Sequence, residues 1–287
     1  AAVIAPHRSG TASRTVRVPS IDMLRGLVMA LMVVDHARDF FGASGFNPRD
    51  VHDAALFLTR WITHLCAPVF VFLAGTSAGL RQHALDNRRA VSGYLLTRGL
   101  WLIALELTIV HIVWSFDVHS NVHYAQVIWA LGVSMIALAA LIYLPRALLL
   151  ALAVAMSAGH NLLDGIRIEG TGIDAALWTL LHQPGEFIAG GATIVVLYPL
   201  IPWIGVMAAG YLFTSVLELP DARRRRMFVA LGGAMLAAFA LLRGLNIYGN
   251  PTPWQRHEHL LATALSFIDC EKYPPSLLFL LVTLGLA

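Results

Sequence analysis

Apolar segments long enough to cross a lipid bilayer recur along almost the whole chain. They fall at about residues 23–41, 61–80, 94–116, 125–144, 147–160, 187–217 and 227–245, and another begins near residue 276. A run of about 20 residues matches the thickness of the hydrocarbon core. There only helices and closed barrels satisfy their backbone, and Leu- and Ala-rich runs without alternation favour helices. The sequence therefore predicts an all-α, polytopic transmembrane bundle of about eight or more helices.

Composition agrees with a membrane protein. Hydrophobic residues make up 57% of the chain, charged residues 13%, and the mean hydropathy is +0.69, whereas soluble domains carry about 25% charged residues. The cysteines Cys66 and Cys270 form no disulfide framework and no CxxC motif, so we expect no metal site. Membrane lipid is an expected partner and nucleic acid is not.

The basic residues predict the orientation of the bundle. With the N-terminus in the cytoplasm, 13 of the 20 basic residues fall on the cytoplasmic side, including the run 223–226, which is Arg throughout. Short cytoplasmic loops are enriched in Lys and Arg. We therefore expect a multi-pass protein of the bacterial inner membrane with a cytoplasmic N-terminal tail, residues 1–18.

Ten of the twelve histidines fall on the opposite, outer side in this topology. Most lie in predicted loops or at helix ends, but His36 and His64 lie within apolar runs. Ionisable residues at membrane depth are costly and are candidates for function. These two histidines are therefore the leading candidates for chemistry.

The stretch "LMVVDHARDF" places four ionisable residues near the outer end of the first helix. Asp35 and His36 are neighbours and point about 100° apart, so they do not face each other. The helix spacing instead allows Asp35 to pair with Arg38, and Asp39 to orient His36. At 1.5 Å per residue, His36 lies in the outer third of the core, where an imidazole should face a cavity.

The second apolar helix supplies a counterpart. Arg60 and His64 lie on one face, and Pro68 cannot donate to the carbonyl of His64, so a kink is expected beside that histidine. Gly75 and Gly79 form a GxxxG spacing that is typical of close helix packing. His36 and His64 both lie toward the outer ends of successive antiparallel helices, so we expect them to meet.

Seven blocks in order resemble bacterial membrane proteins grouped with heparan-alpha-glucosaminide N-acetyltransferase. They are "PSIDMLRGLVMALMVVDHARDFFG", "LTRWITHLCAPVFVFLAGTSAGL", "LTRGLWLIALELTIV", "QVIWALGVSMIALAALIYLP", "YPLIPWIGVMAAGY", "LRGLNIYGNPTPW" and "SFIDCEKYPPSLLFLLVTLG". The resemblance runs from about Pro19 to the end, so we expect residues 19–287 to form one transmembrane acyltransferase-like domain, and we expect that domain to lack the last helices of the family.

The resemblance implies transfer of an acetyl group from cytoplasmic acetyl-CoA to an amino sugar or glycan on the outer side. The family's catalytic histidine falls within a few residues of His52. The animal enzyme has an asparagine where this chain has His36 and an aspartate where it has His64. The candidate catalytic residues are therefore His36, Asp35, His64 and His52, and which histidine is the base stays open.

Coenzyme A requires cations for its phosphates, and four arginines lie at the cytoplasmic ends of the first three helices. These candidate cofactor-binding residues are Arg25, Arg98, Arg17 and Arg88. About 16 Å of helix separates Arg25 from His36, a gap that a pantetheine arm can cover. Alternatively, these arginines only determine the orientation of the helices in the membrane.

Candidate contacts to the acceptor lie in two outer blocks, "LRGLNIYGNP" and "EKYPPS". They are Arg243, Asn246, Asn250 and Lys272. Each residue read alone is also typical of a helix cap or turn. A third outer block, "HNLLD", offers His160, Asn161 and Asp164, and a homodimer is a further expectation.

Two other classes stay open. A transporter could relay protons through buried Asp and His residues. A haem or metal protein would use the many outer histidines as ligands, but no HExxH or CxxC spacing occurs. A Soret band in purified protein would indicate haem, and saturable acetyl-CoA binding would indicate a transferase.

The orientation gives a direct test in intact cells. A cysteine in place of His119 should react with a membrane-impermeant thiol reagent, because we expect residues 118–124 to be external. A cysteine in place of Arg224 should be protected. The reverse labelling pattern would overturn the orientation.

Overall fold

The computed structural model describes residues 19–42 and 47–287, so the predicted tail 1–18 lies outside the described residues. Most of the described chain is helical, as predicted. The helical elements are α1 Pro19–Phe41, α2 Ala54–Thr63, α3 Cys66–Leu85, α4 Arg88–Leu105, the π-helical turn η1 Glu106–Val110, α5 His111–Ser115, α6 Val127–Leu141, α7 Arg146–Ala158, the 3₁₀ turn η2 His160–Leu163, α8 Ile173–Leu181, α9 Leu200–Leu217, α10 Asp221–Leu245, α11 Leu260–Ile268 and α12 Leu277–Leu286.

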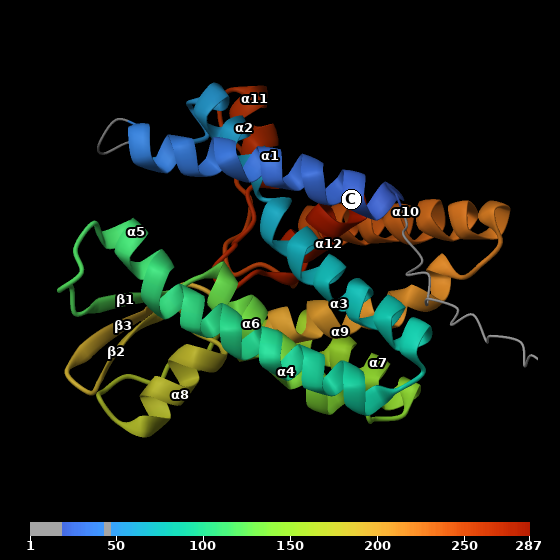
Figure 1. Cartoon of the computed structure of the whole chain (residues 1–287). Coiled ribbons are helices and arrows are strands. Elements are labelled where there is room, and N and C mark those ends of the chain that lie inside the picture. The colour runs from blue at the N-terminus through green and yellow to red at the C-terminus, as the bar shows by residue number, and fades with distance from the viewer. Residues whose placement is uncertain (1–18, 43–46) are drawn as a thin grey trace, which may run out of the picture.

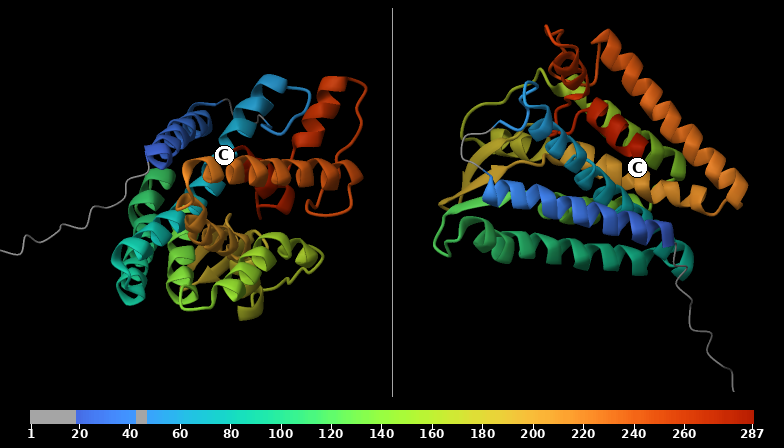
Figure 2. Two further views of the ribbon diagram at one scale, coloured as in Figure 1. Left: turned by 90° about the vertical axis from the view of Figure 1, so that its right-hand side faces the viewer. Right: turned by 90° about the horizontal axis from the view of Figure 1, so that it is seen from above.

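The long helices run back and forth between two ends of the molecule (Figures 1 and 2). One end, here called the sheet end, carries a small β-sheet and the loops 47–53, 246–259 and 269–276. The other, the arginine end, carries the start of α1 and the turns that join α3 to α4 and α9 to α10. A chain that crosses a bilayer repeatedly has this arrangement.

By length and apolar composition, four segments of the described chain are able to cross a membrane. They are Ala54–Leu85, Arg88–Ser115, Leu200–Leu217 and Asp221–Leu245. The helices α6, α7 and α12 are apolar but shorter, with 10–17 residues, and α1 carries five charged side chains. The structure thus supports a helical membrane protein, whereas the expected eight or more spans are not established.

The sheet end departs from the all-α prediction. Strand β3, Ala192–Val196, pairs in parallel with β1, Val122–Ala125, and antiparallel with β2, Gly185–Ala189, so the strand order is β1-β3-β2. Gly190 and Gly191 both have positive φ, which suits a two-residue hairpin. The predicted single helical run at 187–217 was therefore wrong: its first part is a β-branched hairpin, and the helix begins only at Leu200.

The core centres on the contact between α3 and α9, where glycines allow the two backbones to meet. A Cβ atom on Gly75 would lie 2.0 Å from the carbonyl oxygen of Met207, and one on Gly210 equally close to that of Phe72. The Oγ1 atom of Thr76 donates to the carbonyl of Gly210 at 3.1 Å. The predicted packing role of the GxxxG spacing is confirmed, because Gly79 also lies against α9.

Replacing Gly75 with Ala should lower the thermal stability of the purified protein. The added methyl group must push α9 away from α3, and overpacking of this kind costs about 1–3 kcal/mol. The matched control is Gly93→Ala in α4, where nothing lies within 4 Å of the new Cβ atom. Thermal unfolding in detergent should show a lower Tm for the first variant only; equal values would contradict the close contact.

Candidate functional site

Asp35 lies near the sheet end of α1 and points toward the junction of α2 with α3. Its Oδ1 atom accepts a hydrogen bond from Oγ1 of Thr63 at 2.7 Å and pairs with the guanidinium of Arg38 at 2.5 Å. The predicted Asp35–Arg38 pair is thus present. Asp39 pairs with Arg38 at 3.1 Å rather than with His36, so the predicted orientation of His36 by Asp39 is not the arrangement found.

His36 points in a different direction from Asp35. Its ring meets the edge of Trp114 in α5 with centroids 5.5 Å apart, and Phe40 stacks on the same indole at 4.9 Å. The Nδ1 atom of His36 is buried and has no hydrogen-bond partner among the described residues. These contacts tie the sheet end of α1 to α5, and none of them joins His36 to His64.

His64 occupies the break between α2 and α3, close to the kink predicted from Pro68. Its side chain is buried, and its ring packs edge-on against Phe279 at the start of α12, with centroids 5.3 Å apart. The Nε2 atom has no partner within residues 19–42 and 47–287. One imidazole nitrogen of His64 is therefore not engaged by any described residue.

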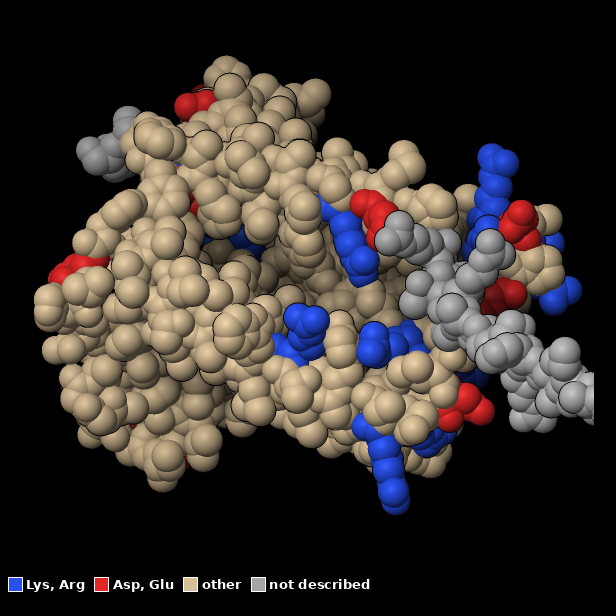
Figure 3. Space-filling model, in the orientation of Figure 1, with Lys and Arg blue, Asp and Glu red and all other residues tan. Residues whose placement is uncertain are grey.

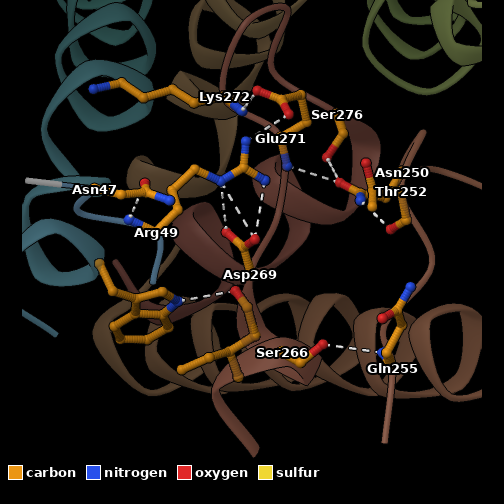
Figure 4. A network of polar contacts seen from close by, with 12 residues as sticks. Asn47, Arg49, Asn250, Thr252, Gln255, Ser266, Asp269, Glu271, Lys272 and Ser276 are labelled. Carbon is orange, nitrogen blue, oxygen red and sulfur yellow. Dashed lines mark hydrogen bonds and ion pairs between the residues drawn. The ribbon is translucent and has the colours of Figure 1, made fainter. Parts of the chain in front are cut away.

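Lys272 brings the loop 269–276 to both of these groups. Its side chain is only 7% exposed and lies near enough to Asp35 and His64 for its charge to act on both, while the direct ion pair of Asp35 is with Arg38. Figure 4 shows the Lys272 side chain extending away from Glu271. The structure therefore gathers Asp35, His64 and Lys272, here called the inner cluster, from three separate parts of the chain.

Arg49 fixes the loop that carries Lys272. Its guanidinium binds Asp269 at 3.0 Å and Glu271 at 2.8 Å (Figure 4). Burial lowers the pKa of Arg49, but hydrogen bonds to both carboxylates outweigh it and raise the pKa above its ordinary value. Sequence reasoning missed this residue because its partners are more than 200 positions away.

Three of the four residues that were predicted to contact the acceptor substrate form hydrogen bonds within the protein instead. Arg243 is 2% exposed and donates to the carbonyls of Thr252, Ser266, Phe267 and Asp269. The amide of Asn246 bonds the backbone of Trp254 in both directions. Oδ1 of Asn250 accepts from the N–H of Glu271 and the hydroxyl of Ser276, so both asparagines shape the loops around the inner cluster.

His52 is exposed at the sheet end, apart from the inner cluster. Its backbone N–H donates to Asp50 at 2.9 Å, and its ring meets that of His257 with centroids 5.7 Å apart. In the same region Cys270 is buried, and burial raises the pKa of its thiol to about 12. The thiol therefore stays protonated and packed.

The predicted cofactor arginines lie at the arginine end. The guanidinium of Arg25 donates to Oγ of Ser77 and to the carbonyl of Leu73 on α3. Arg98 lies over the ring of Tyr94, with 5.6 Å from its Cζ atom to the centroid, and Arg81 lies over the same ring at 4.2 Å. Arg88 is exposed at the start of α4. Arg17 lies outside the described residues.

Figure 3 shows the face between α1 and α4 as a hollow, with basic side chains, all of them arginines, gathered toward the arginine end. The helix α3 forms its floor, because α3 contacts both α1 and α4. One end of the hollow therefore holds cations, and the floor leads along α3 to His64 at the other end.

One family model matches most of the chain. Residues 17–249 match the family model described as the catalytic domain of heparan-alpha-glucosaminide N-acetyltransferase. None of the curated proteins compared with the chain matches it. Because the family model covers most of the chain, the protein belongs to this family.

Arg243→Lys should destabilise the protein although it preserves the charge. A lysine cannot reach four carbonyls with the geometry of a guanidinium, and each buried carbonyl left without a donor costs about 1–3 kcal/mol. We expect a clear fall in Tm in detergent, whereas Arg256→Lys, at an exposed position of the same end, should leave the Tm unchanged. Equal effects of the two substitutions would contradict the structural role of Arg243.

Proposed function

We propose that this member of the heparan-alpha-glucosaminide N-acetyltransferase family is a membrane acyltransferase. It takes an acetyl group from acetyl-CoA at the arginine end and delivers it to an amine of a glycan or amino sugar at the sheet end. The observation that carries the proposal is the inner cluster of Asp35, His64 and Lys272, which lies beyond a hollow whose opposite end holds arginines.

Arg25, Arg81 and Arg98 are the cations proposed to hold the phosphates of coenzyme A. Guanidinium groups recognise phosphate through paired N–H donors. The ten residues of α1 from Arg25 to Asp35 rise about 15 Å, a distance that suits the pantetheine arm. The thioester would then reach the inner cluster while the nucleotide stays among the arginines.

The inner cluster supplies the groups that acyl transfer requires. The acceptor nitrogen forms a bond to the thioester carbonyl carbon, and the carbon–sulfur bond breaks. We assign His64 as the base that removes the amine proton, which the leaving thiolate finally takes up. The ammonium of Lys272 is placed to stabilise the negative charge that develops on the carbonyl oxygen.

We propose different roles for the other candidate catalytic residues. Asp35 holds Thr63 and Arg38 and balances the charge of Lys272. His52, within a few residues of which the resemblance places the family's catalytic histidine, lies on an exposed loop where an outer acceptor would arrive. His36 contacts Trp114 instead of His64, so we propose that it lines the hollow rather than acting as the base.

The proposed orientation determines on which side of the membrane acetyl-CoA and the acceptor bind. The arginine end carries Arg88, Arg146 and the run 223–226, so we assign it to the cytoplasm, where acetyl-CoA is available. The sheet end then faces the outer side of a bacterial inner membrane. Acetyl-CoA and the acceptor would approach from opposite sides, and the acetyl group alone would cross.

A proton-coupled transporter is the second candidate, and one observation favours it. Glu106 is 1% exposed; its Oε1 atom accepts from the N–H of Gln126 at 3.1 Å, and its Oε2 atom has no partner among the described residues. The rings of His111 and His123 stack nearby at 4.1 Å. Proton uptake by liposomes that contain the protein, without acetyl-CoA cleavage, would favour this reading.

Substitution of His64 by Ala should lower acetyl-CoA turnover by roughly 10²–10⁴, the range typical of general acid–base catalysis, with little change in coenzyme A binding. Thiol release by protein in detergent measures the reaction, and calorimetry measures binding. His119→Ala, at an exposed position of the sheet end, is the control. His36→Ala and His52→Ala belong in the same series.

Arg25→Ala should show the opposite pattern, with weaker coenzyme A binding and a smaller change in turnover at saturation. Full turnover in His64→Ala would remove that residue from the base role. If His52→Ala alone abolished turnover, the chemistry would belong to the exposed loop. A loss of turnover in every variant, including the control, would contradict the assignment as a whole.

A further inference from the structure

Three metal-binding side chains gather at the sheet end, outside the inner cluster. His160 opens η2, Asp164 follows that turn, and His182 caps α8. One ligand atom from each residue lies within 4.8 Å of the other two. Nε2 of His182 lies 3.3 Å from Oδ1 of Asp164.

The imidazoles of His160 and His182 are buried so deeply that their ring nitrogens need hydrogen-bond partners or a bound ion. His160 is 1% exposed and His182 is 2% exposed. Neither ring nitrogen of His160, nor Nδ1 of His182, makes a hydrogen bond of good geometry in the described part of the chain, although the backbone of Pro275 lies close to the His160 ring. A buried polar atom without a partner costs about 1–3 kcal/mol, and an ion is one of its ordinary explanations.

We propose that His160, Asp164 and His182 bind a divalent transition metal ion, and that Zn²⁺ is the ion that fits best. Two imidazole nitrogens and one carboxylate oxygen form a ligand set known from zinc sites that keep an open fourth position. Ligand atoms about 2.0–2.2 Å from zinc lie at most about 4 Å apart. The three side chains therefore need only a small closing movement.

Neighbouring contacts orient the carboxylate for this role. Nδ2 of Asn161 donates to Oδ2 of Asp164 at 2.8 Å, which leaves Oδ1 toward the histidines. Oδ1 of the same asparagine accepts the N–H of Leu277 at 2.8 Å, so the start of α12 holds the amide in place. Partners of this kind fix the direction of metal ligands and raise metal affinity.

An open coordination position would face a cavity of about 260 Å³. Asp164 and His182 line this cavity together with Glu271 and Tyr273, whereas His160 lies behind its wall. A water molecule or a ligand oxygen in the cavity could complete the metal's coordination. The cavity wall includes the loop 269–276, so the metal would also order the segment that carries Lys272.

The test uses the full chain purified in detergent, stripped with a chelator and titrated with ZnCl₂. We expect about one tightly bound zinc per chain, measured by elemental analysis after gel filtration, and a rise in Tm. Asp164→Asn, which preserves volume, and His182→Ala each remove a proposed ligand. Loss of a residue that merely supports a ligand already costs about 10–100-fold in metal affinity, so each variant should bind zinc at least about tenfold more weakly. Cobalt in place of zinc should give the visible spectrum of a tetrahedral site.

His257→Ala is the matched control, because His52 and His257 form a separate pair of histidines at the same end. It should bind zinc as the unaltered protein does. Zinc that persists in both Asp164→Asn and His182→Ala, or binding below one-tenth of an ion per chain, would overturn the proposal. These readouts do not involve acyl transfer, so the metal site stands or fails separately from the proposed function.

Discussion

The close contact of α3 with α9 is the interaction on which the arrangement of the polar groups depends. Glycines at 75, 79 and 210 let the two backbones touch, and Thr76 bonds the carbonyl of Gly210 at the crossing. In a bilayer, where burial of apolar surface does not drive association between helices, such small residues supply the packing. Because α3 follows directly after His64 at one end and bonds Arg25 through Ser77 near the other, one fixed helix sets the distance between the proposed base and the proposed cofactor site.

The loops at the sheet end are fixed by two arginines of different character. Arg49 joins the loop after α1 to the loop after α11 through two carboxylates. Arg243 fills the space between α10 and α11 with a guanidinium that serves four carbonyls. Both arginines hold an irregular loop against the helical bundle. Such a loop has no regular backbone hydrogen bonding of its own, so side chains must satisfy its carbonyl groups. The buried ammonium of Lys272 owes its position to the two arginines.

The sequence was sufficient for the features that depend on local pattern. Apolar runs predicted the helices, Pro68 predicted the break near His64, and the Gly75–Gly79 spacing predicted close packing. The hairpin at 185–196 was missed because its strands are as apolar as the following helix, although the pair Gly190–Gly191 and the β-branched "ATIVV" carried the signal. Pairings across the chain, such as Arg49 with Asp269, leave no trace in a single sequence.

Polar residues at the sheet end divide according to whether their hydrogen-bonding capacity is already used. The guanidinium of Arg243 and the amide of Asn250 are occupied by partners in the described chain, so their chemistry is structural. His64 and His160 are buried with ring nitrogens that make no hydrogen bond of good geometry to a described residue. The sequence marks out His64, because it lies within an apolar run, but it does not separate His160 from Arg243 and Asn250. Residues with used and unused hydrogen-bonding groups can be told apart only when donors and acceptors are matched in the structure. A substrate or an ion gains the most binding free energy at residues whose donors or acceptors are still unused.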